Sequence, residues 1–245
     1  MDGRTGYITI SVDDGHESDL RTADLLDEVG LRATFYIPAT NPERPVMANE
    51  EIRSIAGRYE VGGHSFHHRS LTGFDADGAR REIVDGKAWL EDVAETPVRS
   101  FCYPQGKFNR TLARQVQEAG FACGRTCFLN LTARPANPYT WGVSTQAFSH
   151  SRQIQVRHAA VEGNWNGLVN YARIFRGAVD WEDHFTRAAA YVNDHGGIAH
   201  LFLHSWEIDE HDGWSKLRRV LVRVRDDYAL APVTNGELFD QAGAR

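Results

Sequence analysis

The stretch Tyr7 to Gly15 reads YITISVDDG, and the fold of the chain follows from it. It begins as an apolar run rich in β-branched side chains and ends in two adjacent carboxylates and a glycine. Such a run predicts a buried strand, and the polar residues directly after it are then expected at the carboxyl end of that strand. The same arrangement recurs further along the chain, so this stretch predicts the organisation of the rest.

Short apolar runs alternate with segments of helical periodicity along the whole sequence. The runs are 7–12, 33–37, 59–61, 99–103, 121–123, 141–148 and 198–203. Helices are predicted over 20–29 before Gly30, over 112–119 after a capping Asn109, and over 213–228. This alternation indicates β-α units around a parallel sheet, and with no repeat or linker we predict one α/β domain over residues 1–245. The least patterned segment, 149–177, is predicted to be a long loop with a short helix around 168–175.

Composition limits the classes of function. The 245 residues include 27 Lys+Arg and 33 Asp+Glu, a net charge of −6, and are 42% hydrophobic and 24% charged. These values indicate a globular protein, and without a basic block no nucleic-acid partner is expected. The first residues contain no apolar run typical of a signal peptide, and no segment predicts a membrane span. Cys102, Cys123 and Cys127 are expected to be core thiols in a reducing compartment, so we expect a cytoplasmic protein of undetermined oligomeric state.

Polar residues of catalytic type cluster where predicted strands end. The clusters are Asp13-Asp14-Gly15-His16, His64-Ser65-Phe66-His67-His68, Tyr103-Pro104-Gln105-Gly106 and His204-Ser205-Trp206-Glu207. In a parallel barrel the carboxyl ends of all strands meet on one face. These clusters, distant in sequence, are therefore expected to form a single site.

The histidines and carboxylates fit a metal site. His64 and His68 would lie about 13 Å apart in a strand but within about 6 Å on one helical turn, and Gly62 and Gly63 would let the chain curl. Two imidazoles and one carboxylate form an open site for zinc, cobalt, nickel or iron. Adjacent aspartates at a strand end point different ways, so one can bind metal while the other acts as a base. The alternatives are that the aspartates only form a turn and that the histidines are a surface pair.

With these motifs in this order, the sequence resembles the NodB-like polysaccharide deacetylases, which are metal-dependent carbohydrate esterases. SVDDG at residues 11–15, HSFHH at 64–68, RSFCYPQG at 99–106 and LFLH at 201–204 carry the resemblance. It implies a distorted, TIM-like (β/α) barrel of about seven parallel strands and an acylated amino sugar or glycan as substrate. It further implies Asp14, His64 and His68 as ligands of a divalent metal, zinc first. Asp13 is then the general base toward a metal-bound water, His204 the general acid, and the 103–106 turn the oxyanion donor.

Two features depart from the family pattern, and aromatic residues suggest substrate contacts. Where other members place an arginine that orients the catalytic aspartate, this chain has Cys102 and Tyr103, so Arg99 is the expected substitute. A D-x-x-D-W motif is missing; Trp141-Gly142-Val143 or Asp180-Trp181 is a candidate remnant of it, and Asp180-Trp181 equally fits the start of a helix leading to His195. Expected substrate contacts are Tyr103, Gln105, Gly106, Trp206, Arg99 and Trp141, the aromatic ones by stacking on the sugar ring. The run 207–212 is expected to be a solvated loop.

Three other functions remain open. A related metal-dependent amidohydrolase acting on an N-formyl group or a cyclic amide would use the same residues. A serine hydrolase would use Ser65, because GGHSFH partly resembles a nucleophile elbow. A sugar-binding domain without catalysis is disfavoured, because binding alone needs neither both aspartates nor three histidines. A cytoplasmic enzyme would act on a nucleotide-linked, lipid-linked or free amino sugar rather than on an external polymer.

Overall fold

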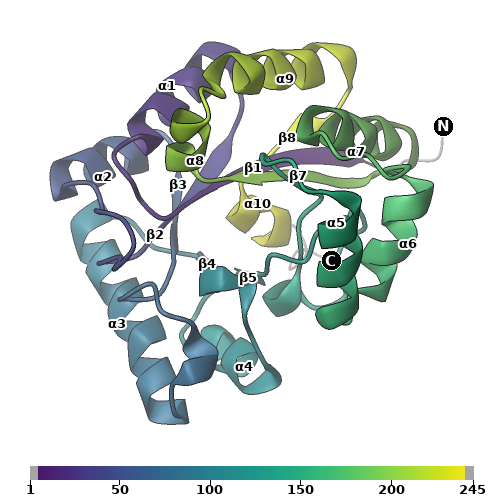
Figure 1. Ribbon diagram of the computed structural model, residues 1–245. Coiled ribbons are helices and arrows are strands. Elements are labelled where there is room, and N and C mark those ends of the chain that lie inside the picture. The colour runs from purple at the N-terminus through teal and green to yellow at the C-terminus, as the bar shows by residue number, and fades with distance from the viewer. Residues whose placement is uncertain (1–4, 241–245) are drawn as a thin grey trace.

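A parallel sheet curls around the centre of the molecule, and helices cover its outer face (Figure 1). The structure is a computed structural model that describes residues 5–240, so the ends of the predicted 1–245 domain lie outside it. The strands are β1 (Gly6–Asp13), β2 (Ala33–Ile37), β3 (Glu60–Gly63), β4 (Ser100–Cys102), β5 (Cys123–Arg125), β6 (Thr145–Gln146) and β7 (Gly197–Leu203), in the order β5-β4-β3-β2-β1-β7-β6. Each overlaps a predicted run, and a short β8 (Ala231–Pro232) pairs with β1.

The barrel is distorted because its two edges barely meet. Within residues 5–240, β5 approaches the β6 edge through an isolated parallel bridge between Arg125 and Trp141 and through the bond from the Thr126 N–H to the Trp141 carbonyl. The other neighbouring strands pair in parallel register. The predicted α/β fold with about seven parallel strands in a distorted barrel is therefore confirmed.

Helices connect the strands and pack on the sheet. They are α1 (Asp19–Val29), α2 (Asn49–Ala56), α3 (Ala76–Ala94), α4 (Arg110–Glu118), α5 (Arg152–Val161), α6 (Trp165–Arg173), α7 (Trp181–His195), α8 (Ser205–Glu210), α9 (Trp214–Asp227) and α10 (Asn235–Asp240), with 3-10 turns η1 (Leu71–Gly73), η2 (Pro104–Gly106) and η3 (Pro138–Thr140). The predicted caps are confirmed: Asn109 accepts from the Leu112 N–H at 2.9 Å, and Gly30 ends α1 with φ 73°. Asp180 caps α7, as expected. Among residues 5–240, no helix is long and apolar enough to cross a membrane.

The amino end of the barrel is filled by side chains, in contrast to the carboxyl end. Asn235, at the start of α10, accepts a hydrogen bond from Thr9 at 2.7 Å and donates one to the Tyr36 hydroxyl at 2.8 Å. These polar groups are buried and satisfy one another, as a buried network must. This network and α10 fill the barrel interior at the amino end, whereas the polar clusters predicted from the sequence follow the carboxyl ends of the strands.

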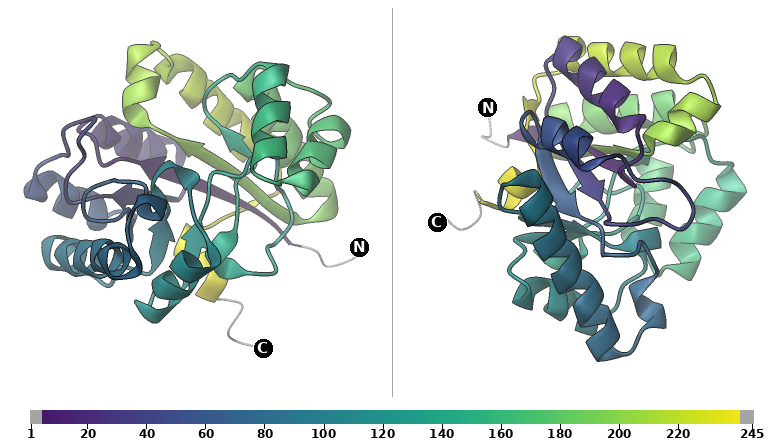
Figure 2. Two further views of the ribbon diagram at one scale, coloured as in Figure 1. Left: turned by 60° about the horizontal axis from the view of Figure 1, so that its bottom comes forward. Right: turned by 90° about the vertical axis from the view of Figure 1, so that its left-hand side faces the viewer.

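The segment 149–177 is not the long loop that the sequence predicts but forms α5 and α6, which lie side by side (Figure 2). Ser151 and Asn164 cap the two helices by accepting backbone hydrogen bonds. In α5 only Gln155 and Ala159 are buried, so the helix shows no apolar period that sequence analysis could detect. The pair is held by Asn130, whose carbonyl accepts from Asn170 and whose side chain donates to Gln155.

Candidate active site

Asp13 and Asp14 enter the site together because the chain turns sharply where β1 ends. Asp13 is the last residue of β1, in register with Tyr36 of β2. In a continuing strand Asp14 would face the opposite side, but its φ of 85° turns its carboxylate into the same cavity of about 300 Å³ that Asp13 lines. Gly15 follows with φ 66°, and a Cβ there would lie 2.8 Å from Ile37 Cγ2. The left-handed turn therefore replaces the predicted divergence of the two carboxylates.

His64 and His68 converge on Asp14 without forming a helical turn. Asp14 Oδ1 lies 3.0 Å from His68 Nε2 and 3.6 Å from His64 Nε2, and the two ring centroids are 4.8 Å apart. The curl comes from left-handed backbone at Ser65 (φ 61°) and at His68 (φ 51°). The histidine pair meets as expected, but through a loop rather than a helix.

The two glycines before the histidines have a packing role instead of the predicted hinge role. Gly62 and Gly63 still belong to β3. A Cβ on Gly62 would lie 2.4 Å from the Tyr36 ring, and one on Gly63 would lie 3.0 Å from Phe121. The absence of side chains there lets two aromatic rings pack against the strand.

The donor set of Asp14, His64 and His68 fits a divalent metal. Their ligand atoms all lie within 4.8 Å of one another, and all three residues are buried. His64 Nδ1 donates to the Cys102 carbonyl at 2.8 Å, which leaves the Nε2 lone pair facing Asp14. Burial lowers the pKa of His64 and favours the neutral, ligating form. Burial raises the pKa of Asp14, but the imidazoles of His64 and His68 beside it outweigh this effect and hold that pKa well below its usual range.

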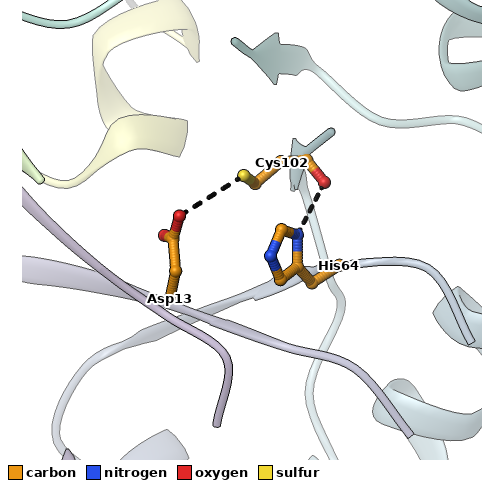
Figure 3. Close-up of side chains that lie close together, drawn as sticks. All are labelled: Asp13, His64 and Cys102. Carbon is orange, nitrogen blue, oxygen red and sulfur yellow. Dashed lines mark hydrogen bonds between the residues drawn. The ribbon is translucent and has the colours of Figure 1, made fainter. Parts of the chain in front are cut away.

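Asp13, His64 and Cys102 also lie close together, but their chemistry does not favour a second metal (Figure 3). The Cys102 thiol donates to Asp13 Oδ2 at 3.7 Å, and burial raises the pKa of that thiol well above its ordinary value. Asp13 is already paired with the guanidinium of Arg125. A protonated thiol and a carboxylate already paired with a guanidinium are poor metal ligands.

Arg125 on β5 is the arginine that holds Asp13. It is fully buried, and its Nη2 donates to Asp13 Oδ1 at 2.5 Å and also to Oδ2. The expected substitute, Arg99, precedes β4 and is exposed at the opposite end of the barrel. There it lines a separate cavity of about 680 Å³ with Arg32 and Glu237. The assignment of Arg99 to the site is therefore wrong, because the chain reaches the carboxyl end of β4 only three residues later.

His204 follows β7 and lies at the edge of the metal-ligand cluster. Its Nε2 is 3.9 Å from Asp14 Oδ2 and its Nδ1 is 3.5 Å from Glu207 Oε2. Burial lowers the pKa of His204, but Glu207, Asp14 and Asp13 outweigh burial and raise that pKa to about 9. Glu207 lies in α8, so the predicted solvated loop is a helix in its first part, and Gln146 donates to Glu207 at 3.2 Å.

Among the expected substrate contacts, Tyr103, Gln105 and Trp206 line the cavity. Gly106, the next residue after Gln105, does not line this cavity. It has φ 67° and lines a neighbouring cavity. The Trp206 indole donates to Asp14 Oδ2 at 2.9 Å, and its ring stacks on His204 with the Arg44 guanidinium 4.1 Å from the ring centroid.

Trp141 does not lie in the cavity. It is buried and stacks on His200 with ring centroids 4.7 Å apart. The expectation that Trp141 contacts substrate is therefore wrong. Trp141 lies where β5 meets the β6 edge, and its ring packs into the protein interior.

Several cavity residues were not identified from the sequence. His150 lies just before α5, and His158 and Glu162 belong to α5 or its cap, so this helix forms one wall of the cavity. His150 Nε2 hydrogen-bonds to Gln146 Oε1 at 2.9 Å. The two histidines, eight positions apart in an unpatterned segment, were the available sequence signal for this wall.

Ser65 has the wrong surroundings for a nucleophile. It is buried, its hydroxyl has no hydrogen-bond partner among the described residues, and it does not line the cavity. Its backbone packs on α3, where a Cβ at Gly86 would come within 2.7 Å of the Ser65 carbonyl carbon. The neighbouring His67 hydrogen-bonds to Glu82 rather than to Ser65. This geometry provides no base for a serine hydrolase.

Comparisons with known proteins identify the family and the fold. The polysaccharide deacetylase family profile matches residues 2–124. The Bacillus subtilis (strain 168) protein YxkH, which carries the name of a polysaccharide deacetylase, is 22% identical over 135 residues, 54% of this chain and 48% of that protein. The chain thus aligns with about half the length of this curated relative.

Two solved structures share the fold. One is from Mycobacterium smegmatis and carries the same family name, with 18% identity, a TM-score of 0.64, and coverage of 99% of this chain and 92% of that chain. The other is a family 4 acetyl xylan esterase from Clostridium thermocellum in complex with a cobalt ion. It is 18% identical, with a TM-score of 0.58 and coverage of 98% and 93%. At these identities the likeness establishes the fold.

Proposed function

Because this chain belongs to the polysaccharide deacetylase family, we propose that it removes an N-acetyl group from an amino sugar, using a divalent metal at Asp14, His64 and His68. The observation that supports the proposal is the convergence of these three ligands in one cavity with Asp13. Asp13 carries a second carboxylate there that the metal does not need as a ligand. A divalent cation, when bound there, supplies the Lewis acidity that activates water and polarises an acyl carbonyl. Zinc suits two imidazoles and a carboxylate, with cobalt, nickel and iron as alternatives.

Asp13 serves as the general base in this proposal. Arg125 donates to both carboxylate oxygens from one side, so the carboxylate is fixed in orientation. Asp13 lines the same cavity as Asp14, within reach of a water molecule beside the metal ligands. The base therefore accepts the proton of the attacking water without displacing a ligand.

His204 serves as the general acid. Its pKa of about 9 keeps the imidazole protonated near neutral pH in the metal-free protein, and Glu207 faces Nδ1 while Nε2 points toward the ligand cluster. A proton on Nε2 is positioned for transfer to the leaving amine, which makes the amine a neutral leaving group.

Gln105 serves as the backbone donor for the oxyanion. In the 103–106 turn, Pro104 has no N–H, the Tyr103 N–H bonds to the Arg125 carbonyl, and the Gly106 N–H bonds to the Tyr103 carbonyl. The Gln105 N–H has no such bond in the described structure, and Gln105 lines the cavity with φ 58°. Gln105 is thus the turn residue whose N–H is available to the tetrahedral oxyanion.

The test combines elemental analysis of the purified chain with acetate release from N-acetylated sugars before and after chelation. We expect about one metal per chain and acetate release that the chelator abolishes. The Asp13→Asn variant is expected to retain the metal and lose about 10²- to 10⁴-fold in kcat. Ser65→Ala is the matched control and is expected to keep its activity.

Two outcomes would redirect the assignment. Metal binding without acetate release would move the search to N-formyl or cyclic amides. Failure to bind metal under reconstituting conditions would refute the proposal.

A further inference from the structure

A second cavity, of about 560 Å³, adjoins the proposed active site, and no step of the proposed reaction uses it. It lies between the α5 helix and the turn that leads from η2 into α4. Gln105, His158 and Glu162 line both this cavity and the active-site cavity, so the two cavities adjoin at these side chains. A molecule bound at the metal ligands can therefore extend into the second cavity.

The wall of the second cavity is largely apolar and aromatic. Phe108, Phe128 and Val161 line it, and the rings of Phe108 and Phe128 meet edge-on with centroids 5.5 Å apart. Phe108 also lies 5.5 Å from Tyr103, which belongs to the active-site cavity. A continuous row of aromatic rings thus leads from the proposed reaction centre into the second cavity.

The exposure of the apolar Val161 side chain is not explained by packing within the chain. It is 80% exposed at the end of α5 and lines the second cavity. An apolar side chain held beside an open aromatic wall gains stability when an apolar group covers it.

The charged groups of the cavity favour a neutral or anionic occupant over a cation. Lys107 contacts the Gln105 side chain, and Arg157 has no hydrogen bond or ion pair among the described residues. Glu162 is the acidic residue in the lining, so the cations outnumber it.

We propose that this cavity binds an apolar group, an alkyl or aryl aglycone, that the substrate carries beside its acylated amino sugar. The inference rests on the proposed deacetylation. It assigns the substrate to amphiphilic amino-sugar glycosides, whose apolar group would cover Phe108, Phe128 and the exposed Val161.

The first experiment compares kcat/KM for the methyl and octyl β-glycosides of N-acetylglucosamine. We expect the octyl glycoside to be favoured at least tenfold, since several methylenes leave water in the cavity. Val161→Asp places a carboxylate on the apolar wall at an exposed position that folding tolerates, and is expected to remove this preference while leaving the methyl glycoside unaffected. Val169→Asp, on the exposed face of α6 outside the cavity, is the matched control and should keep the preference.

A binding measurement separates this inference from the deacetylase proposal. Octyl β-glucoside, which has no acetamido group, is titrated below its critical micelle concentration and followed by calorimetry. Binding that Val161→Asp weakens at least fivefold and Val169→Asp does not would support the cavity even if no acetate is released from any sugar. Equal kcat/KM values for the two glycosides without octyl glucoside binding would overturn the inference and leave the deacetylase proposal intact. A preference for chitin oligosaccharides over the octyl glycoside would also overturn it, because the cavity would then be a sugar subsite.

Discussion

At the scale of single residues, the Asp13 carboxylate depends on a guanidinium 112 positions further along the chain. Arg125→Lys keeps the charge but replaces the planar guanidinium with a shorter, flexible side chain, so the base loses its fixed orientation. We expect roughly a 100-fold loss in kcat with unchanged metal content, measured by steady-state kinetics and elemental analysis. Arg99→Lys is the control and is expected to keep its kcat. Equal kcat values for Arg125→Lys and Arg99→Lys would contradict the role given to Arg125.

Glu207 is expected to set the alkaline limit of activity. Its carboxylate helps to raise the pKa of His204, so Glu207→Gln lowers that pKa and deprotonates the general acid at a lower pH. The alkaline limb of the kcat profile should therefore move to lower pH, with both proteins loaded with the same metal. An unmoved limb would show that His204 does not limit the rate at high pH.

The proposed metal ligands and the proposed general acid could be predicted from the sequence, whereas Arg125 could not. Asp14, His64 and His204 each follow an apolar run, and parallel strands bring such positions to one face. Arg125 lies within a short strand of small and apolar residues, and the direction of its side chain depends on the register between β4 and β5. The prediction that Trp141 contacts substrate was wrong for a similar reason. The sequence does not show to which side of the contact between β5 and the β6 edge an aromatic side chain points.

At the scale of elements, a buried histidine on α7 links the α5–α6 pair to the sheet. His184 accepts a hydrogen bond from the Thr145 hydroxyl and donates one to Asn130 Oδ1, both at 2.8 Å, and it stacks on Phe175. Asn130 in turn contacts α5 and α6. These contacts join residues 39 and 54 positions apart, which is why local pattern did not predict the two helices.

Acid is expected to weaken this link. Burial lowers the pKa of His184 to about 3, whereas an unfolded histidine titrates near 6.5, so the unfolded state binds the extra proton between these values. The free energy of unfolding should fall by about 2 kcal/mol between pH 6 and 4.5 on account of His184 alone. Urea titrations of the parent and of His184→Gln measure this contribution as the difference between their slopes with pH. Parallel slopes would mean that His184 is not neutral in the folded protein.

At the scale of the whole molecule, the proposed metal joins the end of β1 to the loop after β3. Binding to the folded state alone stabilises it in proportion to the logarithm of metal concentration, by about 4 kcal/mol at a thousandfold excess over Kd. We expect zinc to raise the melting temperature and a chelator to lower it. His68→Ala should abolish the shift, while His67→Ala, whose side chain bonds to Glu82 outside the cluster, should retain it.

The narrow contact between β5 and the β6 edge has a consequence for motion. Arg125 takes part in the bridge to Trp141 and also holds Asp13, so a fluctuation that opens the barrel at this point carries the guanidinium away from the proposed base. The Thr126 N–H, which bonds to the Trp141 carbonyl at 2.8 Å, lies at the same place. The rate at which this N–H exchanges with deuterated solvent therefore reports how often the barrel opens here. It also reports how often Arg125 loses its contact with Asp13.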